Sequence, residues 1–508
     1  MLLRDLAAHT DGRLHGDGNV DITSIEYDSR AVHAGSLFVA IPGLKVDGHA
    51  YLGRALEQGA QAVVVQADHE AHWRAIVEES RADVLVLDDT RIGLARLSAA
   101  FYGFPARKLG VIGITGTDGK TSLAHLVAHV FNASGRKTGL ISTAECRIGD
   151  QLLPDTGRFT TPEAPQVQEM LAQMVAAGCR WAVIEATSHG LALHRVDECE
   201  YDIAALTNIG ADHLDFHGSA EEYVAAKGRL FQMLDASVDK GITKTAILNA
   251  DDPACAHFRS VTKATVVTYG LAEADLRAAD ATSNGWPIQF HLSTPSGKRD
   301  VRFPKPGLFN VRNALAATGL GIAAGLPLDE IIPALESWPG APGRMEFIDE
   351  GQPFTVLVDF AHAPDSLRRV LQLLRETVRG RIIAVFGCIG EHDKARRPGM
   401  AQAAADLADY TFITDDNPYS EDRDAILQDI ADAMRATGKR EGHDFSVVPD
   451  RREAISQAVA MAVDEDAILL AGKGHEREVH IGDTAYECDD REVSRRVLRD
   501  LGYAKRPS

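Results

Sequence analysis

A glycine-rich turn at residues 115–122, TGTDGKTS, has the residue types and spacing to bind a nucleotide phosphate. An apolar, strand-like run precedes it at 109–114, and a helix-like stretch follows it. Glycines let backbone N–H groups approach phosphates closely, and the N-terminus of a helix adds partial positive charge. Lys120 would then contact the β- and γ-phosphates, and the Thr121 hydroxyl would bind Mg²⁺.

The glycine spacing departs from the strict phosphate-loop pattern. That pattern requires a glycine at position 114, where this chain has Ile114, and its glycines stand instead at 113, 116 and 119. An ordinary strand–helix connection is one alternative, but the ending GKT favours phosphate binding. A nucleotide-driven switch or assembly protein would use the same loop. It would also carry a base-reading signature or a second acidic metal-binding motif, and neither stands out here.

A second group of titratable side chains follows the next strands. Glu185 ends an apolar run at 182–185, the segment 212–217 (DHLDFH) contains His213, and Lys227 stands on a helix-like stretch. In open α/β sheets ligands bind at the carboxyl ends of the strands, where Glu185 would lie. Each residue alone has a plainer interpretation, either a polar group satisfied within the fold or, for Lys227, a solvated helix face. Their order after a phosphate loop favours a shared site.

Residues of these types suit the activation of a carboxylate by ATP. A carboxylate is a poor acylating agent, and phosphoryl transfer converts it to an acyl phosphate that an amine can attack. The carboxylate and the γ-phosphate are both anionic, so metal ions must bridge and neutralise them. A carboxylate such as Glu185 and an imidazole such as His213 can coordinate those ions.

Length and charge narrow the class of protein. A chain of 508 residues with 45% hydrophobic and 25% charged residues is expected to fold into about three or four globular domains. The net charge of −20 argues against a nucleic-acid-binding protein, because a polyanion would be repelled. A small anionic substrate needs only a few placed donors, so it is not excluded.

Cysteine usage and hydropathy indicate a cytoplasmic protein. The six cysteines form no C-x-x-C pair, which argues against a zinc site, and they are too sparse for a disulfide framework. The first residues lack the apolar core of a signal peptide. No stretch approaches the ~18 apolar residues that a membrane span needs, so we expect neither membrane nor nucleic acid as a partner.

Strand-like and helix-like stretches alternate along the whole chain, which predicts an α/β protein with largely parallel sheets. Two segments rich in proline and glycine look like linkers, YGFPARK at 102–108 and SWPGAPG at 337–343. They predict three domains, at 1–107, 108–343 and 344–508.

The ordered motifs resemble those of the Mur ligase family, and within it the UDP-N-acetylmuramyl-tripeptide synthetases. The resemblance runs nearly from end to end, and it is specific because the motifs keep the family's order. The N-terminal motifs are Asp28-Ser29-Arg30, GSLFVAIPG at 35–43 and DGHAY at 47–51. The central motifs are TGTDGKTS at 115–122, Thr160-Thr161-Pro162, TSHGL at 187–191 with Arg195, DHLDFHG at 212–218, AKGRLF at 226–231, LNADD at 248–252, LFNVRNALAA at 308–317 and GRME at 343–346. The C-terminal motifs are VDFAHAPDSL at 358–367, FGCIGEHDKARRP at 386–398, DNPYSED at 416–422 and GKGHE at 472–476.

The resemblance implies a role for each matching residue. The ATP site would comprise Gly116, Thr117, Asp118, Gly119, Lys120, Thr121, Ser122, Asn310, Arg344, Asp359 and His362. The Mg²⁺ ligands would be Thr121, Glu185, His213 and Lys227, the last as an N-carboxylated lysine, and the catalytic residues would be Lys120, Lys227, Glu185 and His213. The uridine-diphosphate muramoyl dipeptide would contact Ser29, Thr160, Thr161, Thr187 and Arg195. The incoming amino acid would contact Asp416, Asn417, Tyr419, Gly472 and Glu476.

The resemblance also implies a fold and a reaction. It predicts a small uridine-nucleotide-binding α/β domain, a central ATPase-like domain with a mainly parallel sheet and a C-terminal Rossmann-like domain. The reaction would join UDP-N-acetylmuramoyl-L-alanyl-D-glutamate to a diamino acid, with ATP converted to ADP and phosphate. A sister amide ligase such as folylpolyglutamate synthetase is the alternative, and the N-terminal domain and GKGHE count against it. The oligomeric state is not readable.

Three positions depart from the family pattern. Thr187-Ser188 stands where Ser-Ser is usual, so a hydroxyl remains, and Cys388-Ile389-Gly390 stands where Gly-Gly is common. Members that add diaminopimelate usually carry arginine after DNP, and here that residue is Tyr419. The amino acid could therefore be meso-diaminopimelate, L-lysine or L-ornithine. Arg396 or Arg397 could still supply the missing charge.

Overall fold

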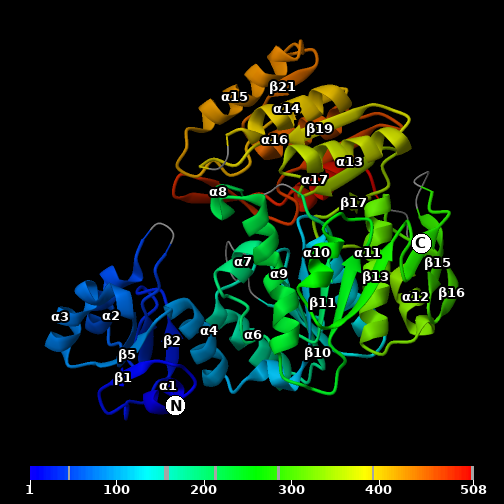
Figure 1. The fold of residues 1–508 in the computed structure, drawn as a ribbon. Helices are drawn as coiled ribbons and strands as arrows, with labels where there is room; N and C mark the ends of the chain where they lie inside the picture. The colour runs from blue at the N-terminus through cyan, green and yellow to red at the C-terminus, as the bar shows by residue number, and fades with distance from the viewer. Residues whose placement is uncertain (44–45, 154–159, 211–213, 283–286, 392–393, 505–508) are drawn as a thin grey trace. The chain divides into compact units, whose positions relative to one another are not determined.

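The computed structural model describes residues 1–43, 46–153, 160–210, 214–282, 287–391 and 394–504. The described chain forms two compact units. Unit 1 comprises residues 1–279, 292–299 and 312–335, and unit 2 comprises residues 280–291, 300–311 and 336–508. Within them lie three mainly parallel sheets of five, eleven and six strands, and a separate two-stranded hairpin (Figure 1).

The N-terminal sheet of unit 1 has the strand order β1-β5-β4-β3-β2, with only β1 antiparallel to its neighbour. Its strands are β1 (Arg13–His15), β2 (Ser24–Glu26), β3 (Ser36–Val39), β4 (Ala62–Gln66) and β5 (Asp83–Leu87). Its helices are α1 (Leu3–Ala7), α2 (Leu52–Glu57), α3 (Glu70–Ser80) and α4 (Thr90–Phe101). Successive residues of β3 face opposite sides, so Leu37 enters the core with α1 and α4 and Phe38 enters the core with α2 and α3.

The eleven-stranded sheet is parallel from β14 through β13, β12, β11, β6 and β10 to β7. Its strands are β6 (Gly110–Thr115), β7 (Thr138–Ile141), β8 (Cys146–Ile148), β9 (Gln151–Leu152), β10 (Trp181–Glu185), β11 (Ile203–Leu206), β12 (Thr245–Asn249), β13 (Thr265–Gly270), β14 (Leu276–Ala279), β15 (Ile288–Thr294) and β16 (Gly297–Phe303). The helices along this part of the chain are α5 (Lys120–Ala133), α6 (Ala164–Ala176), α7 (Ser188–Ala192), α8 (Leu214–His217), α9 (Ala220–Ala236), α10 (Cys255–Ser260), α11 (Leu308–Ala323) and α12 (Leu328–Glu336). Strands β6 and β10 are buried along their whole length, because neighbouring strands and helices enclose both faces.

One buried carboxylate ties the amino ends of the central strands together. Asp202, directly before β11, is fully buried and accepts hydrogen bonds from the backbone N–H of Val111 (2.9 Å) and from Lys244 Nζ (2.9 Å). Lys240 Nζ lies 2.6 Å from Asp202 Oδ2, the oxygen that also accepts the Val111 N–H. This ion cluster sits at the opposite end of the strands from the loops described below, and it fixes β6, β11 and β12 in register.

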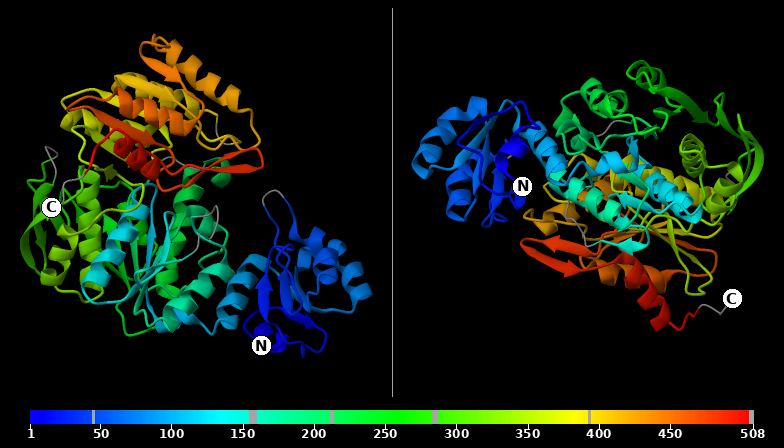
Figure 2. Two further views of the ribbon diagram at one scale, coloured as in Figure 1. Left: turned by 180° about the vertical axis from the view of Figure 1, so that it is seen from behind. Right: turned by 90° about the horizontal axis from the view of Figure 1, so that it is seen from below.

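The six-stranded sheet of unit 2 has the order β17-β18-β22-β19-β20-β21, with only β17 antiparallel. The strands are β17 (Glu346–Ile348), β18 (Thr355–Asp359), β19 (Ile382–Phe386), β20 (Tyr410–Ile413), β21 (Phe445–Val447) and β22 (Ala467–Ala471). The helices are α13 (Pro364–Thr377), α14 (Arg396–Leu407), α15 (Arg423–Ala436), α16 (Arg451–Met461) and α17 (Asp490–Asp500). Helices α13–α15 pack into one core and α16 and α17 into the other, so the sheet is doubly wound. The separate hairpin of β23 (Glu478–Ile481) and β24 (Thr484–Glu487) is drawn in red in Figure 2.

The predicted fold class, an α/β protein with mainly parallel sheets, is confirmed. The domain limits at 107/108 and 343/344 stay predictions, although each predicted domain contains one of the three sheets. All six cysteines are free thiols, as expected for a chain without a disulfide framework. Among the described helices, none is both long and apolar enough to cross a bilayer.

Candidate active site

The phosphate loop joins the central strand β6 to helix α5. Gly116 (φ 144°) and Gly119 (φ 80°) adopt backbone angles that favour glycine, which lets the chain turn sharply between the two elements. Helix α5 begins at Lys120, directly after this turn. The Lys120 ammonium donates a hydrogen bond to the carbonyl of Thr117 (2.7 Å) and so lies folded over the loop. The chain lacks the glycine that the strict pattern has at position 114, and Gly116 and Gly119 make the turn.

A second loop, at 207–210 after β11, braces the phosphate loop. The backbone N–H of Thr117 donates to the carbonyl of Asn208 (2.8 Å). The backbone N–H of Asp118 donates to the Asn208 side-chain oxygen (3.1 Å), and the Thr207 hydroxyl donates to the carbonyl of Asp118 (2.6 Å). Strands β6 and β11 are neighbours in the sheet, so their loops leave it side by side and hold each other in place.

Glu185 is a buried carboxylate beside this loop. It is the last residue of β10 and only 1% exposed. Its carboxylate accepts hydrogen bonds from the Thr121 hydroxyl (3.1 Å), the Ser142 hydroxyl (2.8 Å) and both the N–H and the hydroxyl of Thr143 (3.1 and 3.0 Å). Among the residues that the structure describes, the donors that contact the Glu185 carboxylate are all uncharged. A negative charge is thus buried with neutral donors alone.

This arrangement fits a hard cation. Burying an ionised carboxylate costs several kcal/mol unless a counter-charge accompanies it. The groups at this position, a carboxylate and the hydroxyls of Thr121, Ser142 and Thr143, are all oxygen donors. Mg²⁺ prefers oxygen ligands and binds through one or two carboxylates together with substrate phosphates. Glu185 and Thr121 are therefore suited to hold Mg²⁺ beside a nucleotide, whereas His213 lies outside the described residues.

Lys227 is not a solvated surface residue. It lies on α9, which begins at an N-cap where Ser219 accepts a hydrogen bond from the backbone N–H of Glu222 (3.1 Å). The Lys227 side chain is 1% exposed, and its ammonium donates to the carbonyl of Gly116 in the phosphate loop (2.7 Å). Its nitrogen also lies over the ring of Tyr223, 4.4 Å from the ring centroid. The plainer interpretation of a solvated helix face is therefore wrong, and Lys227 belongs to the loop's surroundings.

Three of the residues predicted to hold the dipeptide are linked by hydrogen bonds near the end of β10. The Thr161 hydroxyl donates to the backbone carbonyl of Glu185 (3.0 Å) and lies 3.0 Å from the Thr187 hydroxyl. Thr187 also caps helix α7 by accepting the N–H of Gly190 (3.0 Å). Arg195 donates to the carbonyl of Thr161 (3.1 Å). The structure thus brings three of the predicted residues to Glu185.

Two further residues predicted to bind the dipeptide are Thr160 and Ser29. Thr160 is half-buried next to Thr161. Ser29 is buried in the loop after β2, in the N-terminal part of unit 1. Nearby, the Tyr27 hydroxyl accepts a hydrogen bond from Gln166 on α6 (3.0 Å), which joins this loop to the central part of the same unit.

Unit 2 holds the remaining residues predicted for the ATP site. The Arg344 guanidinium lies over the ring of Phe360, 4.1 Å from its centroid. Asp359, at the end of β18, accepts the N–H of Met345 (2.8 Å), and His362 donates to the carbonyl of Phe360 (2.7 Å). Asn310, at the start of α11, donates to the carbonyl of Pro306 (2.8 Å).

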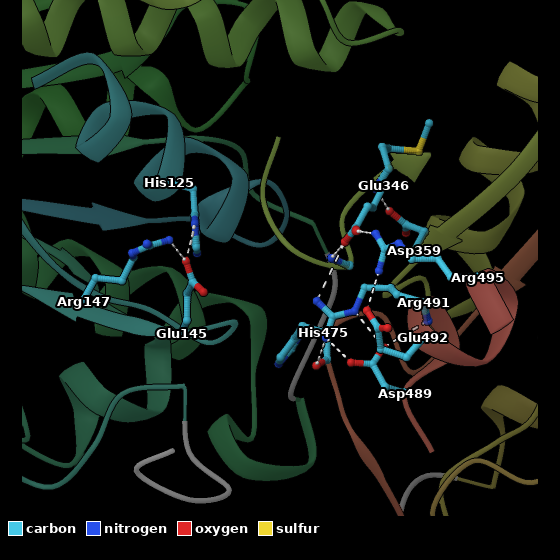
Figure 3. A network of polar contacts seen from close by, with 12 residues as sticks. His125, Glu145, Arg147, Glu346, Asp359, His475, Asp489, Arg491, Glu492 and Arg495 are labelled. Atoms are coloured by element: carbon cyan, nitrogen blue, oxygen red, sulfur yellow. Dashed lines mark hydrogen bonds and ion pairs between the residues drawn. The ribbon is translucent and has the colours of Figure 1, made fainter. Parts of the chain in front are cut away.

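A charged network holds the segment around Arg344 (Figure 3). Glu346 accepts from Arg495 (3.0 Å) and from the N–H of Gly343 (2.9 Å). Arg491 pairs with Asp489 (2.6 Å) and donates to the carbonyl of His475 (3.2 Å). Helix α17 is thereby fixed to both the GRME segment and the GKGHE turn. Figure 3 also shows a separate cluster of unit 1 in which Glu145 pairs with Arg147 (2.8 Å) beside His125 (3.8 Å).

The residues predicted to bind the amino acid follow β20 and β22. The Lys473 ammonium is fully buried and donates to Asn417 (2.9 Å) and Glu476 (2.6 Å), and Asn417 donates to Glu476 (2.9 Å). Gly472 donates its N–H to the backbone carbonyl of Asp359 (3.1 Å). The polar network is thus formed by the chain itself before any substrate binds.

Asp416 differs from these neighbours. It is 2% exposed, and neither of its carboxylate oxygens has a hydrogen-bond partner among the described residues. The nearest cation, the ammonium of Lys473, is 3.9 Å away. Burial raises the pKa of Asp416 to about 6, and the attraction of Lys473 only partly offsets this. Such an unsatisfied buried carboxylate is well suited to receive the ammonium group of a ligand.

Tyr419 stands beside Asp416 and Asn417 and contacts the hairpin β23–β24. Its backbone N–H donates to the carbonyl of His480 (3.0 Å), and its ring stacks on the His480 imidazole with centroids 5.6 Å apart. Arg397, which could have supplied the missing positive charge, is 1% exposed and pairs with Glu421 (2.8 Å) and Asp429 (2.7 Å). Arg397 therefore already has its charge balanced within the fold by two carboxylates.

Sequence reasoning missed several residues of these sites. Ser142 and Thr143 hydrogen-bond Glu185, and their signal was a pair of hydroxyl residues directly after the strand-like stretch at 138–141. Lys473 lies inside the GKGHE motif without having been assigned a role. His480 carried no signal, because its stacking on Tyr419 depends on a contact between distant segments.

A cluster of Asp47, His49 and His69 has the composition of a metal site but not its chemistry. The Asp47 carboxylate lies 2.6 Å from His49 Nδ1 and 3.4 Å from His69 Nε2. However, His49 Nε2 accepts the backbone N–H of Gln66 (2.9 Å), so the imidazole carries its proton on Nδ1. Both nitrogens of His49 are thus used within the fold. This cluster stabilises the DGHAY segment instead.

Comparison with known proteins shows similarity along the whole chain. Residues 21–102 match the catalytic domain of the Mur ligase family, residues 114–321 the Mur ligase middle domain, and residues 343–474 the Mur ligase glutamate ligase domain. The chain is 44% identical over 497 residues to a UDP-N-acetylmuramyl-tripeptide synthetase of Roseiflexus sp. (strain RS-1), with 96% of each chain covered. It is 43% identical over 487 residues to a UDP-N-acetylmuramoyl-L-alanyl-D-glutamate--2,6-diaminopimelate ligase of Bacillus licheniformis, again with 96% of each chain covered. A solved structure of a ligase with that same name aligns with a TM-score of 0.65 at 30% identity and covers 99% of each chain.

The two carboxylates of the 416–421 loop predict opposite effects on stability. The raised pKa of Asp416 means that folding favours its protonated form, so its ionisation costs stability as the pH rises from about 4 through about 6. Asp416→Asn removes that cost and should stabilise the protein at pH 7.5 by on the order of 2 kcal/mol, with a smaller gain at pH 5. Melting curves at both pH values measure this.

Glu421→Gln is the matched control. Burial opposes its ionisation, but hydrogen bonds from the Glu391 N–H, Arg397 and Lys394 outweigh it and hold the pKa of Glu421 at about 2. Its ionised form therefore contributes stability above about pH 4.5 that is lost as the pH falls toward 2, and Glu421→Gln should lower the melting temperature at pH 7.5. If Asp416→Asn were also less stable at pH 7.5, the charge of Asp416 would be satisfied within the fold.

Proposed function

The chain belongs to the Mur ligase family, and we propose that it is an ATP-dependent ligase that adds a diamino acid to UDP-N-acetylmuramoyl-L-alanyl-D-glutamate. The products would be the tripeptide, ADP and phosphate. The observation that carries the proposal is the buried Glu185, held by neutral donors beside Thr121 of a phosphate loop. At this end of the sheet, a cation, a nucleotide and an acidic substrate would then bind together.

The reaction follows from the groups available. An oxygen of the substrate's glutamyl carboxylate attacks the γ-phosphorus, the bond to the β–γ bridging oxygen breaks, and ADP leaves. The amine of the diamino acid then attacks the acyl carbon, the amide bond forms, and phosphate departs with the amine losing a proton. Bound Mg²⁺ would neutralise the negative charges that meet in the first step. Lys120 and the N–H groups of the phosphate loop would hold the phosphates in line.

The remaining roles are carried over from the family as part of the same proposal. Gly116, Thr117, Asp118, Gly119 and Ser122 would surround the phosphates, and Asn310, Arg344, Asp359 and His362 would complete the ATP site. His213 and a carbamylated Lys227 would join Thr121 and Glu185 as Mg²⁺ ligands. Ser29, Thr160, Thr161, Thr187 and Arg195 would bind the UDP-linked dipeptide, and the hydrogen bond from Thr161 to the Glu185 backbone supports that placement.

The identity of the diamino acid rests on the loop after β20. Seven relatives at 38–43% identity are named for 2,6-diaminopimelate, whereas the name of the Roseiflexus relative leaves the amino acid unspecified. Diaminopimelate exceeds lysine by one distal carboxylate, which an arginine fork binds better than a phenol does. Tyr419 offers no charge, and Arg397 is already paired with two carboxylates. The unsatisfied Asp416 favours an ammonium group, which all three candidate amino acids carry. We therefore propose meso-diaminopimelate, L-lysine or L-ornithine as the amino acid, with weaker discrimination for diaminopimelate than an arginine at position 419 would give.

The other functions considered are less well supported. A structure of E. coli FolC in complex with ADP aligns with a TM-score of 0.60 at only 19% identity, which is a likeness of fold alone. The relatives at 43–44% identity over 96% of both chains are all named for the muramoyl peptide reaction. A nucleotide-driven switch protein does not account for the Asp416 and Lys473 network in unit 2.

Lys120→Ala should abolish ligation while the protein stays folded. The substitution removes the positive charge aimed at the transferring phosphoryl group and is expected to lower kcat by ~10²-fold or more, as removal of an oxyanion donor does. Phosphate release with ATP, the UDP-linked dipeptide and each amino acid measures it. Lys108→Ala, an exposed lysine just before β6, is the control and should retain full activity. Near-normal ligation by a folded Lys120→Ala variant would exclude the role.

Lys227→Ala should be nearly inactive and partly rescued by acetate. An ammonium beside Mg²⁺ repels it, whereas a carbamate or an added carboxylate supplies the oxygen ligands that Mg²⁺ prefers. Lys120→Ala is the matched control, since acetate cannot replace a cation and should not restore that variant. Full activity of Lys227→Ala, or equal rescue of both variants, would contradict the carbamate.

Tyr419→Arg should shift the amino-acid preference toward diaminopimelate. A charged bidentate contact to the distal carboxylate is worth about 1.5–3 kcal/mol, or roughly 10- to 100-fold in kcat/KM. Tyrosine and arginine tolerate the left-handed backbone at this position (φ 52°) about equally, so the side chain alone is tested. The measurement is kcat/KM for lysine, ornithine and diaminopimelate in the wild type, Tyr419→Arg, Tyr419→Phe and Arg396→Ala.

A wild type already selective for diaminopimelate, and unchanged by Tyr419→Arg, would show that recognition lies elsewhere. Loss of that selectivity in Arg396→Ala would then assign the charge to Arg396. Tyr419→Phe keeps the ring that stacks on His480 and should leave the preference of the wild type almost unaltered.

A further inference from the structure

Tyr223 links helix α9 to the phosphate loop through its hydroxyl. The side chain is 2% exposed, and its oxygen lies 2.9 Å from the Thr117 hydroxyl, so the two groups share a hydrogen bond. The Thr117 hydroxyl also accepts the backbone N–H of Gly210 (2.8 Å). A side chain on α9, the loop after β11 and the phosphate loop therefore meet at one hydroxyl group.

Tyr223 and Lys227 act on consecutive residues of the phosphate loop. They are four residues apart on α9, which places them on the same helix face. Tyr223 reaches Thr117, while the ammonium of Lys227 reaches the carbonyl of Gly116 (2.7 Å) and lies over the Tyr223 ring. The ring of His217 packs edge-on against the same tyrosine at 5.3 Å. The packing of His217 and Lys227 against the tyrosine ring thus holds its hydroxyl toward Thr117.

The proposed reaction would change two of the contacts that fix this loop. Lys120 now donates to the carbonyl of Thr117 and would leave it to reach a phosphate. A carbamylated Lys227 would no longer present an ammonium to Gly116. The contact between Tyr223 and Thr117 requires neither group and can persist throughout. Together with the hydrogen bonds of Thr207 and Asn208 to Asp118, it can keep the loop's N–H groups aimed at the nucleotide.

We propose that Tyr223 is a positioning residue for ATP, which fixes the phosphate loop through Thr117 and shields Lys227 with its ring. This inference rests on the proposed function insofar as it takes ATP as the ligand of the loop. A net hydrogen bond contributes about 0.5–1.5 kcal/mol, so loss of the hydroxyl should weaken ATP binding about three- to tenfold. The effect should appear in the KM for ATP and not in the KM for the amino acid.

The test is the dissociation constant of Mg·ATP, measured by calorimetry on the full-length protein and its variants. Tyr223→Phe removes only the hydroxyl, and Thr117→Val removes its partner at nearly constant volume. Each should raise the dissociation constant about three- to tenfold, and the double variant should bind no more weakly than the weaker single variant. Tyr201→Phe is the control, because it removes another fully buried tyrosine hydroxyl, from a residue that lies two positions before β11 at the amino end of the sheet.

A second readout addresses the ring. Tyr223→Leu should lower kcat as well as ATP affinity, because it uncovers Lys227, whereas Tyr223→Phe should leave kcat nearly unchanged. Unaltered ATP binding by Tyr223→Phe, additive effects in the double variant, or an equal loss in Tyr201→Phe would overturn the inference. A wild type that binds ATP but forms no tripeptide would overturn the proposed reaction alone. A wild type that does not bind ATP would overturn both.

Discussion

The buried charge of Glu185 is the constraint on which the central site depends. A carboxylate with 1% exposure needs donors on every side, and here they come from β7's following loop, from the phosphate loop and from the backbone. Hydroxyl and amide groups satisfy the hydrogen-bonding capacity of the carboxylate but leave its charge uncompensated. A cation bound beside Glu185 and Thr121 would balance this charge, together with the further negative charge that a phosphate chain would bring.

Parallel strands make that concentration of groups possible. Loops that follow β6, β7, β10 and β11 all leave the same edge of the sheet, so residues from distant parts of the chain meet there. The opposite edge is closed by Asp202, whose two lysines and backbone donor tie the amino ends together. One end of the sheet is therefore held by the ion pairs of Asp202, while the other carries the loops around Glu185.

Unit 2 repeats the contrast within a single loop. Glu421 is fully engaged by Arg397 and Lys394, and its ionised form supports the fold. Asp416, five residues earlier, is buried without a hydrogen bond and opposes the fold when ionised. Asp416 lowers the stability of the folded protein when it is ionised, and Glu421 raises it. A destabilising buried charge is expected at a site where a ligand supplies the opposite charge. The hydrogen bond between Lys473 and Asn417 holds the neighbouring side chains in place, so that a bound ligand would meet a fixed set of polar groups.

Sequence patterns by themselves determined the fold class, the phosphate loop and the position of Glu185 at the end of a strand, because each depends on residues close together in the chain. The roles of the site residues, phosphate binding by that loop included, and the domain limits remain predictions. Only the tertiary structure decided that Lys227 is buried, that Ser142 and Thr143 surround Glu185, and that Arg397 is already paired. It also joined Tyr223 to Thr117 across 106 positions of the chain. Those contacts unite segments far apart in sequence, so no local spacing could have encoded them, and the packing of helices against the sheet set them.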